Sequence, residues 1–219
     1  MRIHYLPIIP IIKYHNTQLF EKSSISTHMT IYFEEAGVHT EEVLHLVKER
    51  AFQGDISAVL IATTKGTTIK AALQILKNIK DNSQKTVLLI AVTHQAGFIK
   101  PGKVELDENL REDFENRGVK VLTTTHAFAG VDRAVRKKHG TWQISELIAE
   151  TLRIFGQGTK VCAEITLMAA DSGLIGTNKV IAIGGTGRGA DTAWVIQPAH
   201  TSTFFDLKMQ ELICKPINF

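Results

Sequence analysis

The chain has 219 residues, of which 44% are hydrophobic and 21% charged, and its formal net charge is +3. This length and balance are typical of a globular protein with an ample core; they exclude a disordered or fibrous chain, and no apolar run is long enough to span a membrane. The basic residues are dispersed except in Arg133–His139, a run too short for a nucleic-acid-binding surface and better interpreted as a solvated helix face.

The first 28 residues differ from the rest of the chain. Their apolar patch LPIIPII is broken by Pro7 and Pro10, whereas a signal peptide needs an uninterrupted apolar core and a small-residue cleavage site. We expect residues 1–28 to form a poorly ordered or loosely packed extension; a start codon assigned too far upstream is the alternative. Cys162 and Cys214 lack metal-site spacing and lie in apolar company, which favours buried, reduced thiols and a cytoplasmic location.

From Met29 onward, strand and helix patterns alternate. Residues 29–33 predict a short strand, and Thr40 is the expected cap of a helix over 40–53 that stops at Gly54. Three continuous apolar runs are typical of buried parallel strands. They are SAVLIA (57–62), TVLLIAVT (86–93) and VKVLTTT (119–125). The segments between them, IKAALQILKNI (69–79) and DENLREDFENRG (107–118), have helical patterns.

The second half is first helical and then rich in strands. The predicted helices lie in residues 128–140, 142–156 and 159–173. The predicted strands are KVIAIGG (179–185) and ADTAWVIQPA (190–199), and KMQELICKP (208–216) is expected to close the fold as an edge strand or short segment. This order predicts an α/β fold, a three-layer α/β/α arrangement with a mostly parallel sheet, in one domain over residues 29–219.

Four predicted strands are followed by loops rich in threonine, glycine and histidine. These loops are residues 63–68 (TTKGTT), 93–97 (THQAG), 123–130 (TTTHAFAG) and 184–192 (GGTGRGADT). Ligands of open parallel sheets bind beyond the carboxyl ends of the strands, where hydroxyls, free amides, Lys65 and Arg188 would suit an anionic ligand. The alternative is that these are ordinary turns and helix caps. The candidate binding residues are Thr63, Thr64, Lys65, Gly66, Thr67, Thr68, Thr93, His94, Gly97, His126, Gly130, Gly187, Arg188 and Gly189.

Two glycine-rich segments resemble nucleotide-binding motifs but lack their chemistry. Residues 97–104 nearly match a P-loop, yet Val104 stands where the magnesium-binding hydroxyl belongs and Pro101 removes an amide. Residues 185–189 are followed by a strand pattern, whereas a dinucleotide fingerprint requires a helix there. No metal-site spacing is present.

The candidates for catalysis are two histidines. His94 and His126 follow successive predicted strands at corresponding positions, so they could face one cleft and exchange protons, or each could hydrogen-bond its own turn. Glu164 lies within an apolar helix pattern and needs a partner there, either as a structural anchor or as a ligand contact.

The segments SAVLIATTKGTTIKAAL and TVLLIAVT resemble the start of the pyruvate kinase C-terminal α/β domain. Over residues 29–216 the chain is similar to a family of stand-alone pyruvate kinase α/β-domain-like proteins, through IYFEEAG, AVTHQAGF, TTTHAFAGVDRAV, VCAEITLMAADSG, GGTGRGADTAWVIQPAH and FFDLK. The resemblance implies that residues 63–68 correspond to an effector-phosphate loop and 187–189 to a second loop. It also implies flavin mononucleotide (FMN) as cofactor, surrounded by THQAG, THAFAG and MAADSG.

We therefore expect a protein that binds a phosphorylated small molecule, in particular a flavin nucleotide. The chain has no segment for the catalytic barrel of pyruvate kinase, so that activity is not expected. The alternatives are a flavin-dependent oxidoreductase with His94 or His126 as proton donor, and a ligand-free regulatory or interaction domain. The expected partners exclude nucleic acid and membranes, and a homo-oligomer is compatible with the sequence.

Overall fold

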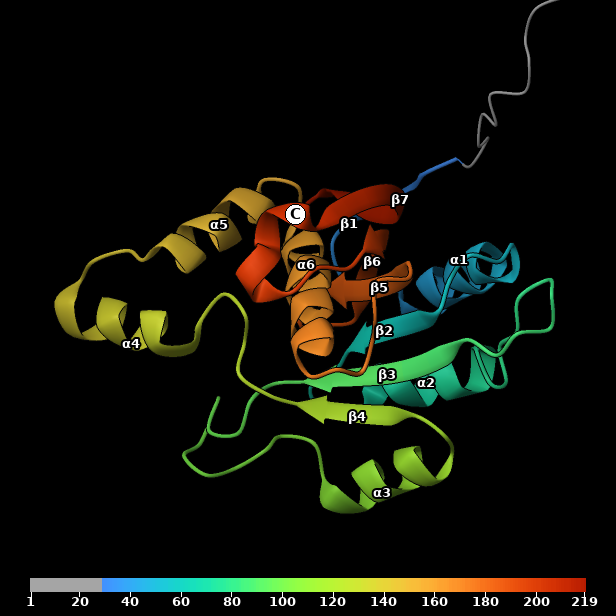
Figure 1. Ribbon diagram of the computed structural model, residues 1–219, viewed down its shortest axis with the longest axis horizontal. Coiled ribbons are helices and arrows are strands. Elements are labelled where there is room, and N and C mark those ends of the chain that lie inside the picture. Colours follow the sequence, from blue (N-terminus) through green and yellow to red (C-terminus); the bar gives the residue numbers. More distant parts are fainter. Residues whose placement is uncertain (1–28) are drawn as a thin grey trace, which may run out of the picture.

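The computed structural model describes residues 29–219, so the predicted extension over residues 1–28 lies outside the described part. A single seven-stranded sheet, in the order β1-β7-β6-β5-β2-β3-β4, forms the centre of the molecule (Figure 1). The strands are β1 (Ile31–Glu35), β2 (Ala58–Ala62), β3 (Leu88–Thr93), β4 (Lys120–Thr123), β5 (Val180–Gly185), β6 (Ala190–Gln197) and β7 (Lys208–Asn218).

Six of the seven strands run in the same direction, and β6 alone opposes its neighbours. In the register of the central strands, Ile61 of β2 lies between Ala91 of β3 and Ile183 of β5. The carboxyl ends of β2, β3, β4 and β5 consequently share one edge of the sheet, where the predicted loops begin. The mostly parallel sheet of the sequence prediction is confirmed.

Helices cover both faces of the sheet, as a three-layer α/β/α fold requires. The helices are α1 (Thr40–Phe52), α2 (Thr67–Ile75), α3 (Glu108–Asn116), α4 (Gly130–His139), α5 (Ile144–Arg153), α6 (Gln157–Asp171) and the short 3-10 helix η1 (Thr201–Asp206). Helices α1, α2 and α3 pack on one face and α6 on the other. Alternate residues of β2 separate these two cores: Val59 and Ile61 face α1 and α2, while Leu60 faces α6.

The structure corrects two sequence predictions. The C-terminal segment is neither short nor at an edge, because β7 pairs with β1 on one side and β6 on the other. Thr40 does not cap α1; the N-cap residue is His39, and the Thr40 hydroxyl accepts a hydrogen bond from the backbone N–H of Ala190 at 3.1 Å. This hydroxyl therefore joins α1 to β6 rather than capping the N-terminus of α1.

Helix α6 approaches the sheet unusually closely because glycines face each other at the contact. A Cβ on Gly184 of β5 would lie 2.5 Å from the carbonyl oxygen of Gly158, and a Cβ on Gly158 would lie 2.2 Å from Oγ1 of Thr192. Figure 1 shows α6 lying across the strands rather than along them. The next turns of α6 are thereby held against the loops that follow β3 and β4.

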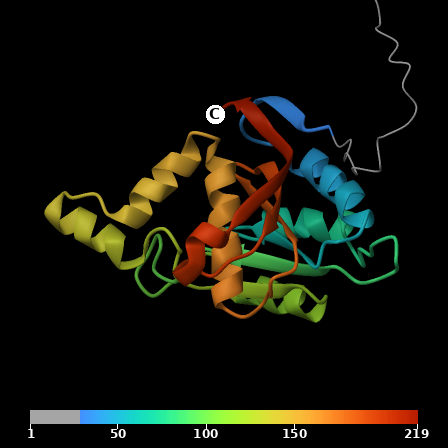
Figure 2. The same cartoon turned by 45° about the horizontal axis from the view of Figure 1, so that its top comes forward.

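Helices α4 and α5 form an arm that extends beyond the rest of the molecule (Figure 2). No side chain of α4 is fully buried, whereas α5 packs on α6 through Ala149. Among the helices of residues 29–219, none combines the length and apolar character needed to cross a bilayer.

The contact between α6 and the sheet predicts a sharp difference between two glycine substitutions. Gly158→Ala places a methyl group in space occupied by Thr192, so we expect the free energy of unfolding to fall by about 1–3 kcal/mol or more. Gly176→Ala is the matched control, because a Cβ there has no atom within 4 Å. Urea unfolding measures both; equal midpoints for the two variants would show that α6 does not depend on this close approach.

Candidate functional site

The loops after β3 and β4 bring two histidines into contact. Nδ1 of His94 lies 3.2 Å from Nε2 of His126, and the two rings are nearly parallel, with centroids 5.1 Å apart and an interplanar angle of 14°. Successive positions along a strand alternate between faces, so both histidines turn toward α6 while Thr93 turns away from it. The common location that the sequence suggested is therefore present in the structure.

Glu164 of α6 has the partners that its burial demands. One carboxylate oxygen accepts the backbone N–H of Phe128 at 3.2 Å. The other forms an ion pair with Lys160, one helical turn earlier, and lies 3.6 Å from Nδ1 of His126. The side chains of Lys160 and Glu164 are only 7% and 5% exposed, so this ion pair belongs to the protein interior.

Burial keeps both histidine rings neutral near pH 7. Desolvation lowers the pKa of His126 from 6.5 to about 4, against the opposing attraction of the Glu164 carboxylate. Desolvation also lowers the pKa of His94. The pKa of Lys160 is lowered by the same cause, and Glu164 opposes that shift as well. The cluster therefore offers uncharged imidazoles beside a buried ion pair.

An aromatic ring and a cation extend the histidine pair. The ring of Phe98 stacks on His94 with centroids 4.0 Å apart and an angle of 3° between planes. The guanidinium carbon of Arg133 lies 5.5 Å from the centre of the Phe98 ring. Within residues 29–219, Arg133 has no carboxylate within ion-pair distance.

The basic run of α4 is therefore only partly the solvated face that the sequence indicated. Arg133 lies over Phe98, and Nε of Arg136 contacts Oε1 of Glu146 at 2.6 Å. Lys137 and Lys138 are exposed.

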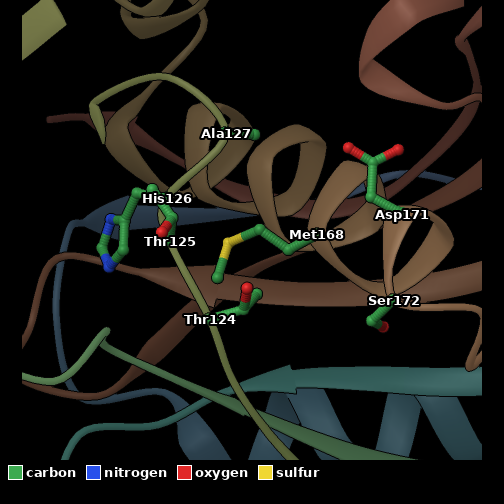
Figure 3. Close-up of a pocket in the computed structure, with 7 residues that line it drawn as sticks. All are labelled: Thr124, Thr125, His126, Ala127, Met168, Asp171 and Ser172. Carbon is green, nitrogen blue, oxygen red and sulfur yellow. The ribbon is translucent and has the colours of Figure 1, made fainter. Parts of the chain in front are cut away.

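A cavity of about 280 Å³ lies beside His126. Its walls come from the loop after β4 and from the C-terminal end of α6, and Figure 3 shows the Met168 side chain extending between them toward Thr124. The lining residues are Thr124, Thr125, His126, Ala127, Met168, Asp171 and Ser172. Most of the polar groups are hydroxyls; the carboxylate of Asp171 accepts hydrogen bonds from the backbone N–H and hydroxyl of Thr201.

The loop of residues 63–68 lies at the same edge but turns to the opposite face. The N–H of Thr63 donates to the carbonyl of Val92 at 3.0 Å, which keeps the loop beside β3. Gly66 adopts φ +89°, and a Cβ there would lie 3.0 Å from the Phe114 ring. The backbone N–H of Gly66 donates to the Thr63 hydroxyl at 3.1 Å. Glycine is required here both by the backbone angle and by the packing of α3.

The other predicted binding residues are more dispersed. Arg188 donates to the carbonyl of Ala36 at 3.4 Å, and Gly189 packs against Thr40, so residues 187–189 lean toward β1 and α1 rather than the histidines. The hydroxyl of Thr93 bonds that of Thr123 at 2.7 Å, on the face away from α6. The remaining two are backbone positions: the N–H of Gly97 donates to the carbonyl of Lys103, and Gly130 begins α4 with φ +46°.

Sequence reasoning did not identify Lys160, Arg133 or Phe98 as members of this cluster. For Lys160 a signal exists: it precedes Glu164 by four residues in an otherwise apolar helix, the spacing at which opposite charges meet. For Phe98 and Arg133 no local signal exists, because their contact joins a loop to α4 across 35 residues of chain.

Other reactive groups do not form a competing site. Cys162 and Cys214 are buried and not bonded to each other, as expected, and burial raises the pKa of Cys214 to about 12. Across residues 29–219, His, Cys, Asp and Glu side chains nowhere gather in a group of three that could hold a metal ion. A comparison of the sequence with models of known protein families finds no match.

The depressed pKa of His126 predicts a pH dependence of stability. In the unfolded chain His126 takes up a proton near pH 6.5, whereas in the folded chain it does so near pH 4. Unfolding is therefore accompanied by the uptake of a proton on His126 between pH 4 and pH 6.5. The stabilisation of the folded state is fully present above pH 6.5 and is lost as the pH falls toward 4. Between pH 7 and pH 5 this loss amounts to about 2 kcal/mol.

Urea unfolding at several pH values measures this loss. The slope of stability against pH should be shallower in His126→Gln than in the wild type over this range, while His45→Gln, at an exposed position of α1, should keep the wild-type slope. An unchanged slope in His126→Gln would contradict the assignment.

Proposed function

We propose that the protein binds a phosphorylated small molecule at the carboxyl edge of the sheet, and that this molecule is a flavin nucleotide. The observation that carries the proposal is the N-terminus of α2. Within residues 29–219 the side chains of Thr64, Lys65, Thr67 and Thr68 form no hydrogen bond, and the backbone amides of Thr67 and Thr68 have no backbone acceptor.

These groups are of the kinds that bind phosphate. The N-terminus of a helix carries a partial positive charge and unpaired N–H groups, and α2 has no acidic residue in its first turn and no side-chain cap. Lys65 is exposed at the turn and adds a full charge. Hydrogen bonds between such groups and an ionised phosphate contribute about 1.5–3 kcal/mol each.

The choice of a flavin nucleotide rests on two further points. Residues 63–68 resemble an effector-phosphate loop, and the resemblance of the chain to stand-alone pyruvate kinase α/β-domain-like proteins implies FMN as the ligand. In addition, the neighbouring loop supplies flat, uncharged rings, because His94 stacks on Phe98. Such rings can stack on a planar heterocycle, whereas small side chains cannot.

A second candidate function is a flavin-dependent oxidoreductase. The contact between His94 and His126 favours it, since neutral imidazoles beside a bound flavin can donate or accept protons during hydride chemistry. Turnover of a reduced nicotinamide by the flavin-loaded protein would distinguish this enzyme from a protein that only binds the nucleotide.

The proposed ligand is tested by comparing FMN with riboflavin. Protein purified with bound flavin should absorb at about 450 nm. Stripped protein should bind FMN in calorimetric titrations and bind riboflavin at least tenfold more weakly, because only FMN carries the phosphate. Equal affinities for FMN and riboflavin would contradict a phosphate-binding site. No binding of either compound would favour a ligand-free interaction domain.

Variants of α2 locate the phosphate. Lys65→Ala combined with Thr68→Val should abolish FMN binding without changing the urea midpoint, since neither side chain has a partner within the described chain. Lys70→Ala, which removes an exposed lysine from the same helix just after its first turn, is the matched control and should bind as the wild type does. Unchanged FMN affinity in the double variant would place the phosphate elsewhere.

A further inference from the structure

We infer that the chain carries an acid–base site at the ends of β3 and β4, in which His94 presents the lone pair of Nε2 to a bound molecule. His126 and Glu164 are positioning residues that hold this tautomer. The inference does not depend on the identity of the phosphorylated ligand, because it follows from contacts among side chains of this chain alone.

The direction of the hydrogen bond between the two histidines follows from the groups on either side of His126. On its Nδ1 side lies the carboxylate of Glu164 at 3.6 Å, and on its Nε2 side lies Nδ1 of His94 at 3.2 Å. An ionised carboxylate only accepts, so the proton of neutral His126 is on Nδ1. Its Nε2 is then an acceptor, and His94 must donate from Nδ1. The Nε2 atom of His94 is left without a proton.

Glu164 is held as an acceptor by two donors on α6 and on the loop after β4. Lys160 forms an ion pair with one oxygen, and the backbone N–H of Phe128 donates to the other at 3.2 Å. A buried carboxylate with both oxygens engaged by donors keeps its orientation. The fixed carboxylate thereby determines which nitrogen of His126 carries the proton, and through His126 which nitrogen of His94 does.

The charged groups that face the histidines come from three elements. Lys160 and Glu164 lie on α6, Arg133 on α4, and Glu105 on the loop between β3 and α3. Of these, Arg133 is half-buried, lies over Phe98 and has no ion-pair partner within the described residues. A half-buried guanidinium in that situation is suited to an anionic group of a ligand.

These features define the class of molecule that the site would take, a small hydroxylated anion. Arg133 would bind the anionic group of this ligand, and the ligand hydroxyl would donate to Nε2 of His94. Nε2 of His94 then acts as a general base toward that hydroxyl: as the oxygen reacts, its O–H bond breaks and an N–H bond forms at Nε2, and the reverse step returns the proton.

The tautomers are measured by long-range ¹H–¹⁵N correlation spectra of the full-length, ¹⁵N-labelled protein at pH 7. We expect His94 and His126 both to carry the proton on Nδ1, whereas free histidine favours Nε2. A proton on Nε2 of either ring would overturn the inference. In Glu164→Gln the amide can also donate, so both rings should lose the single Nδ1–H form.

His200 provides an internal control for this variant. Its Nδ1 lies 3.2 Å from a carboxylate oxygen of Asp171, far from Glu164 along the helix, so its tautomer should not change in Glu164→Gln. A uniform change in all three rings would indicate a general rearrangement and would contradict a relay that acts through Glu164.

Reactivity tests whether the lone pair of His94 is accessible. Diethyl pyrocarbonate acylates unprotonated imidazole nitrogen, and mass spectrometry locates the product. We expect carbethoxylation of His94 at Nε2 before His126, and severalfold slower reaction of His94 in His126→Phe, with circular dichroism confirming the fold. Glu164→Gln gives a second readout if His126→Phe does not fold. An unreactive His94, or one that reacts equally in the variants, would overturn the inference.

The ligand class is tested with glycolate, the simplest hydroxylated carboxylate. Its addition to the wild type should shift the ¹⁵N resonance of His94 Nε2, and Arg133→Gln should weaken the response at least tenfold. Lys137→Gln, at an exposed position of α4, is the matched control. Equal responses in all three proteins, including no response in any, would exclude Arg133 and hydroxylated anions from the site.

Discussion

The close approach of α6 to the sheet is the contact on which the candidate site depends. Because Gly158 and Gly184 lack side chains, the first turn of α6 rests directly on the ends of β5 and β6. The following turn then carries Lys160 and Glu164 under the loop after β4. If α6 packed on the sheet at the larger distance usual for a helix on strands, the Glu164 carboxylate would lose its contact with His126. Backbone packing thus sets the chemistry of side chains several residues away.

The parallel strands divide the proposed binding edge into two parts. Consecutive loops leave the same edge, but the loop of residues 63–68 turns toward α3, whereas His94 turns toward α6. The phosphate-binding groups of the proposal and the stacked rings are consequently on opposite faces, with the end of the sheet between them. A ligand that reaches both must separate its phosphate from its ring by an extended chain. A flavin nucleotide has this shape, which supports the proposal beyond the resemblance of one loop.

The sequence predicts those features that depend on local pattern. Continuous apolar runs identified β2, β3 and β4, and helical periodicity identified the helices that cover them. The position of β7 was not predictable in this way, because its pairing with β1 joins residues about 180 positions apart and neither strand carries a mark of its partner. The same holds for Thr40, whose hydroxyl serves a distant amide, and for the stack of Phe98 and Arg133. Glu164 was the exception, since a carboxylate in an apolar helix requires a partner wherever the fold places it.

The buried ion pair explains why this part of the core departs from ordinary packing. Removing Lys160 and Glu164 from water is costly, and a pair of apolar side chains of similar size would commonly stabilise a protein as well or better. Stability alone therefore does not account for two charges with exposures of 7% and 5%. Orientation does account for them, because a carboxylate fixed by Lys160 and the Phe128 amide can hold His126 in one tautomer. An uncharged pair could fill the same volume, but it could not set the direction of the hydrogen bond between His126 and His94.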